Sequence, residues 1–125
     1  MIRILVIDDD PNVRQMLCSM LEREGFETET AVNGHQGMAQ FRANPAQLVI
    51  TDIIMPEQEG IETIRQLKTE FPDVPVIAMS GGGRIGPSDY LSMAKLLGAA
   101  YTLSKPFDRA QLLIAVRDVL GASLV

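Results

Sequence analysis

The sequence has little of what secreted, membrane-spanning or nucleic-acid-binding proteins require. Among 125 residues there is one cysteine, Cys18, so no disulfide can close within the chain and a reducing compartment is expected. The formal net charge is −5, which leaves no basic excess for nucleic acid or an anionic membrane. No apolar run reaches membrane-spanning length, and residues 1–7 meet three acids too early for a signal peptide. We expect a soluble, cytoplasmic protein that binds neither DNA nor membrane directly.

The composition is that of one folded domain. Hydrophobic residues make up 46% of the chain, which excludes a disordered polypeptide. A length of 125 residues is enough for one core and too short for two. The sequence contains no internal repeat, low-complexity segment or linker. We therefore expect residues 1–125 to form a single domain.

Short apolar runs alternate with amphipathic segments along the chain. Such runs predict strands at residues 2–7, 48–52, 76–79 and 100–103, and the alternation of residues 26–32 predicts another. We expect all five strands to be buried. Apolar residues three and four apart predict five helices, at residues 11–25, 35–42, 60–71, 88–97 and 107–120. Right-handed crossovers place helices on both faces of a parallel sheet. The predicted fold is α/β, a doubly wound five-stranded parallel sheet flanked by five helices.

Local signals indicate where several of these elements begin and end. Asp10 followed by Pro11 is typical of a helix start, with an N-cap and a proline at the first helical position. Asn33-Gly34 predicts a turn, and Gly98 predicts the end of a helix. Residues 80–87 contain three successive glycines and predict a long loop.

Polar residues follow four of the predicted strands. In open parallel sheets, ligands bind at the carboxyl ends of the strands. An ionised carboxylate at the tip of a buried strand is costly unless a cation or hydrogen-bond donors compensate it. We expect three acids, a hydroxyl and an amine to meet at this edge: Asp8, Asp9, Asp52, Ser80 and Lys105.

Clustered carboxylates favour a hard divalent cation, and few protein ligands favour Mg²⁺ over Ca²⁺. The cation would make Asp52 a nucleophile toward a phosphoryl group, while Lys105 and Ser80 would contact the phosphoryl oxygens. Each residue also has a plainer interpretation, as a turn residue, a helix-end charge or a solvated lysine. Their joint presence at four strand ends favours the site.

These motifs resemble the receiver domain of two-component response regulators over nearly the whole chain. The resemblance rests on residues 4–10, 52–56, 98–99 and 105–107, together with Gly60 and Ser80. It implies a flavodoxin-like fold with strand order 2-1-3-4-5. It also implies that Asp52 accepts a phosphoryl group from a phosphohistidine of a sensor kinase or phosphotransfer protein.

The resemblance further assigns a role to each candidate residue. Lys105 would pair with the phosphoryl group, and Ser80 would be the switch hydroxyl. The implied Mg²⁺ ligands are two carboxylates and a backbone carbonyl, with one acid acting through water: Asp9, Asp52, the carbonyl of Ile54, and Asp8. Such a domain is a signalling switch and not an enzyme, apart from Mg²⁺-dependent self-phosphorylation and self-dephosphorylation.

The chain departs from the family pattern near the fifth strand. The position three residues before Lys105, where receivers usually carry a switch aromatic, is Thr102, and Tyr101 is one position away. The segment between Ser80 and Lys105 is also longer than usual. We therefore expect residues 81–97 to take over the readout of phosphorylation, with downstream partners docking there. Cys18 and His35 are expected to be structural, and the glycines of the loop lack the Gly-Lys-Ser/Thr continuation of a phosphate loop.

Two other functions stay open at this point. One is a Mg²⁺-dependent phosphohydrolase working through an aspartyl-phosphate, although such enzymes commonly carry a second acid where this chain has Ile54. The other is a receiver-like binding module that is never phosphorylated, which the complete set of acids, hydroxyl and lysine argues against. Since the last predicted helix is followed by only five residues, a receiver of this length would act through protein contact or onward phosphotransfer.

Overall fold

The computed structural model describes residues 2–53, 59–80, 92 and 94–121. Five parallel strands form one sheet in the order β2-β1-β3-β4-β5, which confirms the predicted fold and strand order. The strands are β1 Arg3–Ile7, β2 Glu27–Ala31, β3 Leu48–Asp52, β4 Val76–Ser80 and β5 Tyr101–Ser104. The helices whose full extent the structure describes are α1 Pro11–Arg23, α2 Gly34–Ala43, α3 Glu59–Glu70 and α5 Arg109–Leu120.

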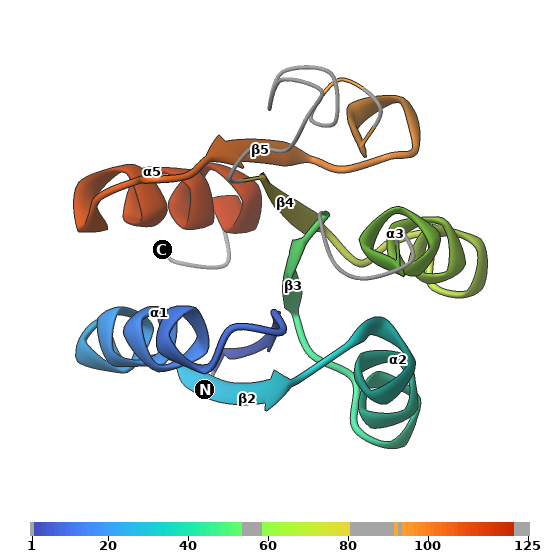
Figure 1. The fold of residues 1–125 in the computed structure, drawn as a ribbon, viewed down its shortest axis with the longest axis horizontal. Helices are drawn as coiled ribbons and strands as arrows, with labels where there is room; N and C mark the ends of the chain where they lie inside the picture. The colour runs from blue at the N-terminus through green and yellow to red at the C-terminus, as the bar shows by residue number, and fades with distance from the viewer. Residues whose placement is uncertain (1, 54–58, 81–91, 93, 122–125) are drawn as a thin grey trace.

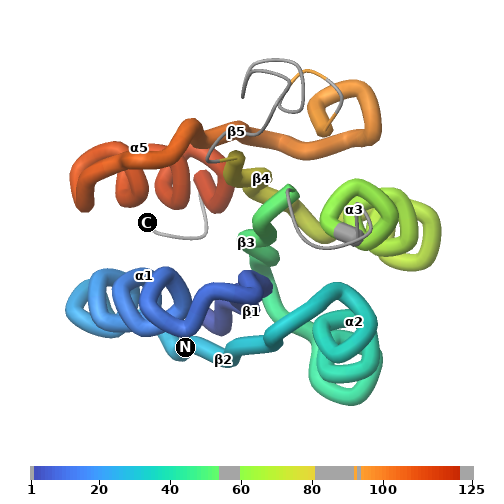
Figure 2. The backbone as a smooth tube through the Cα atoms, in the orientation of Figure 1, coloured from blue at the N-terminus to red at the C-terminus, as the bar shows by residue number. Residues whose placement is uncertain are grey.

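Helices cover both faces of the sheet, with α1 and α5 on one face and α2 and α3 on the other (Figures 1 and 2). The alternation of side chains along β1 serves both layers, since Ile4 and Val6 pack with α1 and α5 while Leu5 and Ile7 pack with α2 and α3. Residues 92 and 94–96 are also helical, whereas Leu97, the predicted last residue of the 88–97 helix, lies in a turn. Residues 88–91 and 93 lie outside the described residues.

The strands are not all buried as predicted. β1, β3 and β4 lie inside the sheet and are almost wholly buried. β2 and β5 are edge strands that are only partly buried, because each has one neighbouring strand. On β2, the solvent-facing Glu27 and Glu29 form ion pairs with Arg3 of β1 at 3.2 and 3.8 Å. Charged side chains of this kind protect a sheet edge from pairing with another chain.

Helix capping confirms one predicted boundary and corrects two. The Asp10 carboxylate accepts a hydrogen bond from the Asn12 backbone N–H, with Pro11 as the first residue of α1. The predicted turn at Asn33-Gly34 is wrong, because the Asn33 side chain accepts from the Gln36 N–H at 2.7 Å and caps α2. Asparagine favours both turns and N-caps, so the dipeptide alone does not distinguish them.

The second correction concerns α5, which was predicted to begin at Phe107 and begins at Arg109. Asp108 and Gln111 form a capping box, each side chain accepting a 2.8 Å hydrogen bond from the backbone N–H of the other. Phe107 is left outside the helix and is buried between α1 and α5. In the part of the chain that the structure describes, no helix has the length and apolar character needed to span a bilayer.

Candidate functional site

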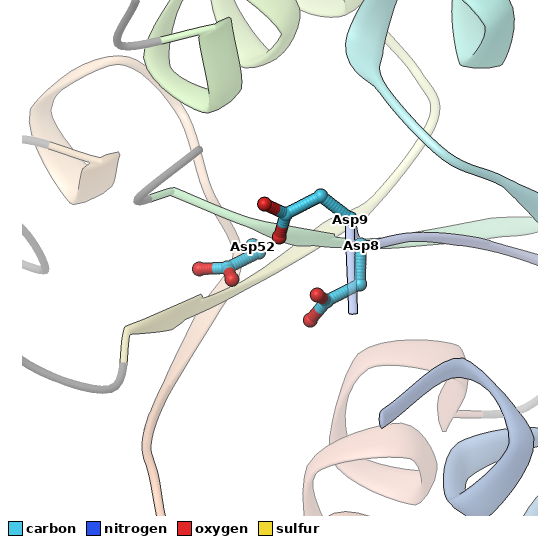
Figure 3. A group of neighbouring side chains, drawn as sticks. All are labelled: Asp8, Asp9 and Asp52. Atoms are coloured by element: carbon cyan, nitrogen blue, oxygen red, sulfur yellow. The ribbon is translucent and has the colours of Figure 1, made fainter. Parts of the chain in front are cut away.

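Three carboxylates meet at the carboxyl ends of β1 and β3. One oxygen from each of Asp8, Asp9 and Asp52 lies within 4.8 Å of the others, and Figure 3 shows the three side chains extending to the same side. Asp8 is fully buried and Asp52 is 5% exposed, whereas Asp9 is exposed. The arrangement follows from the sheet register, because β1 and β3 are adjacent and pair Ile7 with Thr51, so each acid comes next in line.

Lys105, which directly follows β5, brings a cation to two of these acids. Its Nζ atom lies 3.0 Å from Asp8 Oδ2 and 3.0 Å from Asp52 Oδ2. Its backbone N–H donates to the Ser80 carbonyl at 2.8 Å, which ties the strand end to β4. Burial acts to lower the pKa of the Lys105 ammonium, but the charges and hydrogen bonds of Asp52 and Asp8 outweigh it and raise that pKa. The lysine is therefore held protonated beside the acids.

The charges of the site favour a second cation, because the cluster of three carboxyl groups has one ammonium, which contacts two of them. The donor set consists of carboxylate oxygens, the ligands that Mg²⁺ prefers, and one of the three acids is open to solvent. The residues present therefore fit a hydrated Mg²⁺ ion. Ile54, whose carbonyl was predicted as a further ligand, lies outside the described residues.

Ser80, the last residue of β4, contributes a buried hydroxyl. It has no exposed surface, and in the described part of the structure its Oγ atom has no hydrogen-bond partner. A buried polar group left unpaired costs about 1–3 kcal/mol, so an orphan of this kind points to a missing ligand. The register pairs Asp52 with Met79, which puts Ser80 one residue beyond the level of Asp52 on the neighbouring strand.

Gly60 in the first turn of α3 lets the helix approach the end of β3. A Cβ atom at this position would lie 2.2 Å from the Asp52 carbonyl oxygen and 2.5 Å from the Ile53 Cα atom. Both are backbone atoms, so a side chain could be accommodated only by moving the strand end that carries Asp52. Close packing of α3 against the strand end that carries Asp52 thus explains why the sequence motif has a glycine at position 60.

Two backbone-directed contacts around Asp8 were missed by sequence reasoning. The Asp10 N–H donates to Asp8 Oδ1 at 2.9 Å, and the Arg14 guanidinium Nη1 donates to the Asp8 carbonyl at 2.6 Å. The second has a signal in the sequence, because a basic residue at the fourth position of a helix leans back toward the strand that precedes it.

Other predicted positions lie away from this site. Tyr101 packs with the apolar residues between α1 and α5, while Thr102, the next residue on β5, is half-buried. Because side chains alternate along a strand, Thr102 faces the other layer. His35 is exposed on α2, and Cys18 is half-buried on α1. Most of the segment 81–97 lies outside the described residues.

The fold and this geometry define a class, that of α/β domains with a buried aspartate at the carboxyl edge of a parallel sheet. The model of the response regulator receiver domain family matches residues 4–117. The chain belongs to the response regulator receiver domain family. Receiver domains are signalling domains of two-component systems that are phosphorylated on aspartate and interact with histidine kinases or phosphotransfer proteins.

Individual relatives differ in length. The chain is 31% identical over 118 residues to sporulation initiation phosphotransferase F of Bacillus subtilis, covering 94% of this chain and 93% of that protein. It is 33% identical over 124 residues to the CpxR homolog, a transcriptional regulatory protein of Haemophilus influenzae, covering 98% of this chain and 52% of that protein. It spans 25% of the regulatory protein AtoC of Escherichia coli.

Solved structures give the same result. A response regulator receiver domain protein of Clostridium thermocellum is similar with a TM-score of 0.88 and 32% identity, covering 99% of this chain and 98% of that chain. The chemotaxis protein CheY4 of Vibrio cholerae is similar with a TM-score of 0.85 and 28% identity, covering 96% and 99%.

Proposed function

We propose that this chain is a phosphorylation-switched receiver in which Asp52 accepts a phosphoryl group from a phosphohistidine of a sensor kinase or phosphotransfer protein. The observation that carries the proposal is the group of three carboxylates within 4.8 Å, two of them 3.0 Å from Lys105 Nζ. A nucleophilic carboxylate, a fixed cation and an acidic metal site are the parts that phosphoryl transfer to aspartate requires.

In the proposed reaction an oxygen of Asp52 attacks phosphorus. A P–O bond forms, the P–N bond to the donor imidazole breaks, and the electron pair returns to the imidazole nitrogen. Asp9, Asp52 and the carbonyl of Ile54, with Asp8 acting through water, would hold Mg²⁺, which would neutralise charge on the phosphoryl oxygens. The protein contributes the orientation of Asp52 at the strand end.

Lys105 and Ser80 act on the product in this proposal. Lys105 pairs with Asp52 in the free protein, and after transfer its ammonium pairs with a phosphoryl oxygen. The Ser80 hydroxyl, buried and without a partner in the described structure, donates to another of these oxygens. Phosphorylation would thereby give the Ser80 hydroxyl a hydrogen-bond partner and would pull the segment that follows Ser80 toward the site.

The readout of the switch is proposed to involve residues 81–97 and to lead to a downstream protein target or onward phosphotransfer. Thr102 is small and polar, so it cannot repeat the movement of an aromatic side chain into a vacated space. Amide hydrogen exchange of the free and phosphorylated protein tests this. Protection should change in residues 80–97, and a response confined to β5 would contradict it.

The central experiment incubates the protein with a small-molecule phosphodonor and Mg²⁺ and follows its intact mass. One phosphoryl group per chain, absent in Asp52→Asn, supports the proposal. Catalytic turnover of an external phosphate ester would favour the phosphohydrolase, for which the chain has Ile54 where an acid would be expected. No reaction of either kind would favour a binding module that is not phosphorylated.

A further inference from the structure

The loop that joins β1 to α1 is held by a contact outside the proposed donor set. The Arg14 Nη1 atom donates to the Asp8 carbonyl oxygen at 2.6 Å, and Arg14 is half-buried. We infer that Arg14 is a positioning residue for the acidic cluster, fixing the peptide group that joins Asp8 to Asp9. The inference rests on the proposed function, because it concerns the same Mg²⁺ and phosphoryl site.

The local fold explains why an arginine is needed there. The last pairs of β1 in the sheet are Ile7 with Ala31 and Ile7 with Thr51, so the Asp8 carbonyl lies beyond both ladders. A buried carbonyl without a donor is costly. Arg14 is the fourth residue of α1, and helical side chains lean toward the helix N-terminus, so its guanidinium reaches back to this carbonyl.

With the Asp8 side chain held by neighbouring contacts, the group that is still free to rotate is the peptide that joins Asp8 to Asp9. The Asp8 side chain is already fixed, since Oδ1 accepts from the Asp10 N–H at 2.9 Å and Oδ2 accepts from Lys105 Nζ at 3.0 Å. Asp9 is exposed, so its direction depends on the backbone that precedes it. Arg14 holds that backbone, and thereby keeps the Asp9 carboxylate within reach of Asp8 and Asp52.

Charge and position predict opposite effects on metal binding. Arg14 is a cation, so as a charge alone it repels Mg²⁺, and its removal would tighten metal binding. As a positioning group it orders the ligands, and its removal weakens binding. Groups that orient metal ligands typically contribute about 10–100-fold to metal affinity. The sign of the change in Mg²⁺ affinity therefore separates the two roles.

The test titrates the full chain with Mg²⁺ alone and follows backbone amide chemical shifts. Arg14→Met removes both the hydrogen-bond donor and the positive charge, whereas Arg14→Lys keeps a donor and the charge but replaces the guanidinium with an ammonium. Arg23→Met makes the arginine-to-methionine change at an exposed position in the last turn of α1. We expect an about tenfold weaker Kd in Arg14→Met, partial recovery in Arg14→Lys, and no weakening in Arg23→Met. Metal-free melts check that each variant folds, and Arg14→Gln replaces Arg14→Met if the latter does not.

The outcomes distinguish this inference from the function on which it rests. Unchanged or tighter Mg²⁺ binding in Arg14→Met, with a wild-type protein that binds, overturns the positioning role and leaves the proposed function standing. A wild-type protein that does not bind millimolar Mg²⁺ overturns the metal site itself. Equal weakening in Arg23→Met would show a general effect on the folding or stability of α1 and would also overturn the role of Arg14.

Discussion

The two ends of the sheet differ in what they hold. At the carboxyl end the side chains are charged, closely spaced and largely buried, with three carboxylates within 4.8 Å of one another and one ammonium 3.0 Å from two of them. At the amino end of β3 and β4 lies a hollow of about 730 Å³ bordered by Phe41, Phe71, Val74 and Leu120, together with the turn prolines Pro45, Pro72 and Pro75. The same strands connect the two.

The hollow at the amino end is not the better candidate for chemistry. The amino-end hollow is built from apolar rings and turns, including an edge-to-face pair of Phe41 and Phe71 with ring centroids 4.7 Å apart. The exposed acid Glu70 beside it is paired with Arg42, whose hydrogen bond lowers the pKa of the Glu70 carboxyl. At the carboxyl end, by contrast, three carboxylates and an ammonium meet next to the buried Ser80 hydroxyl. The convergence of charged groups, not volume, marks the site.

The largest expected effect comes from Asp52→Asn. An amide of the same shape cannot form the acyl phosphate, so phosphorylation should fall to background by intact mass. The fold should persist, because the change removes one of several clustered negative charges. The matched control at the amino end is Asp73→Asn, which changes an exposed acid at the hollow and should leave phosphorylation intact. Loss of the fold in Asp52→Asn would instead give Asp52 a structural role.

Phe41→Ala is expected to destabilise the packing at the amino end of the sheet and to leave the chemistry at the carboxyl end unchanged. Phe41 is 2% exposed and packs against Phe71, so its removal should cost about 3–5 kcal/mol of unfolding free energy. Denaturant unfolding measures this loss. Under conditions where the variant is folded, the extent of phosphorylation per chain should match the wild type. A selective loss of phosphorylation would show that the two ends are coupled through the strands.

Mg²⁺ should stabilise the carboxyl end by a smaller amount. A ligand at ten times its Kd adds about 1.4 kcal/mol to the unfolding free energy by mass action. Millimolar Mg²⁺ should therefore raise the melting temperature of the wild type, and it should raise that of Asp73→Asn by the same amount. The shift should disappear in Asp9→Ala, which removes the exposed acid of the cluster. An equal shift in Asp9→Ala would place the stabilising ion elsewhere.

The strands and helices, and the proximity of the acids, could be predicted from the sequence for the same physical reason. Asp8 and Asp52 end apolar runs, and the ends of parallel strands lie on one edge, so their proximity follows from topology. The orphan hydroxyl of Ser80 and the hydrogen bond of Arg14 depend on side-chain distances, which no spacing rule supplies.

Boundaries were less predictable, because caps compete with turns. Asn33 and Asp108 became N-caps through hydrogen bonds to residues three positions on, and this choice depends on how the following helix packs. The partial exposure of β2 and β5 depended on their place at the sheet edges, which only the strand order decides.

The smallest expected effect concerns Cys18, which lies on α1 and belongs to neither end. Burial raises the pKa of the Cys18 thiol, and a hydrogen bond with Thr28 only partly opposes it. The native thiol should stay protonated at pH values where an unfolded chain already carries the thiolate. Stability linked to Cys18 is therefore fully present below the ordinary thiol pKa and is lost as the pH rises through the native value. Alkylation rates against pH, native and in urea, measure the difference. A native profile that coincides with the unfolded one would mean that burial does not control this group.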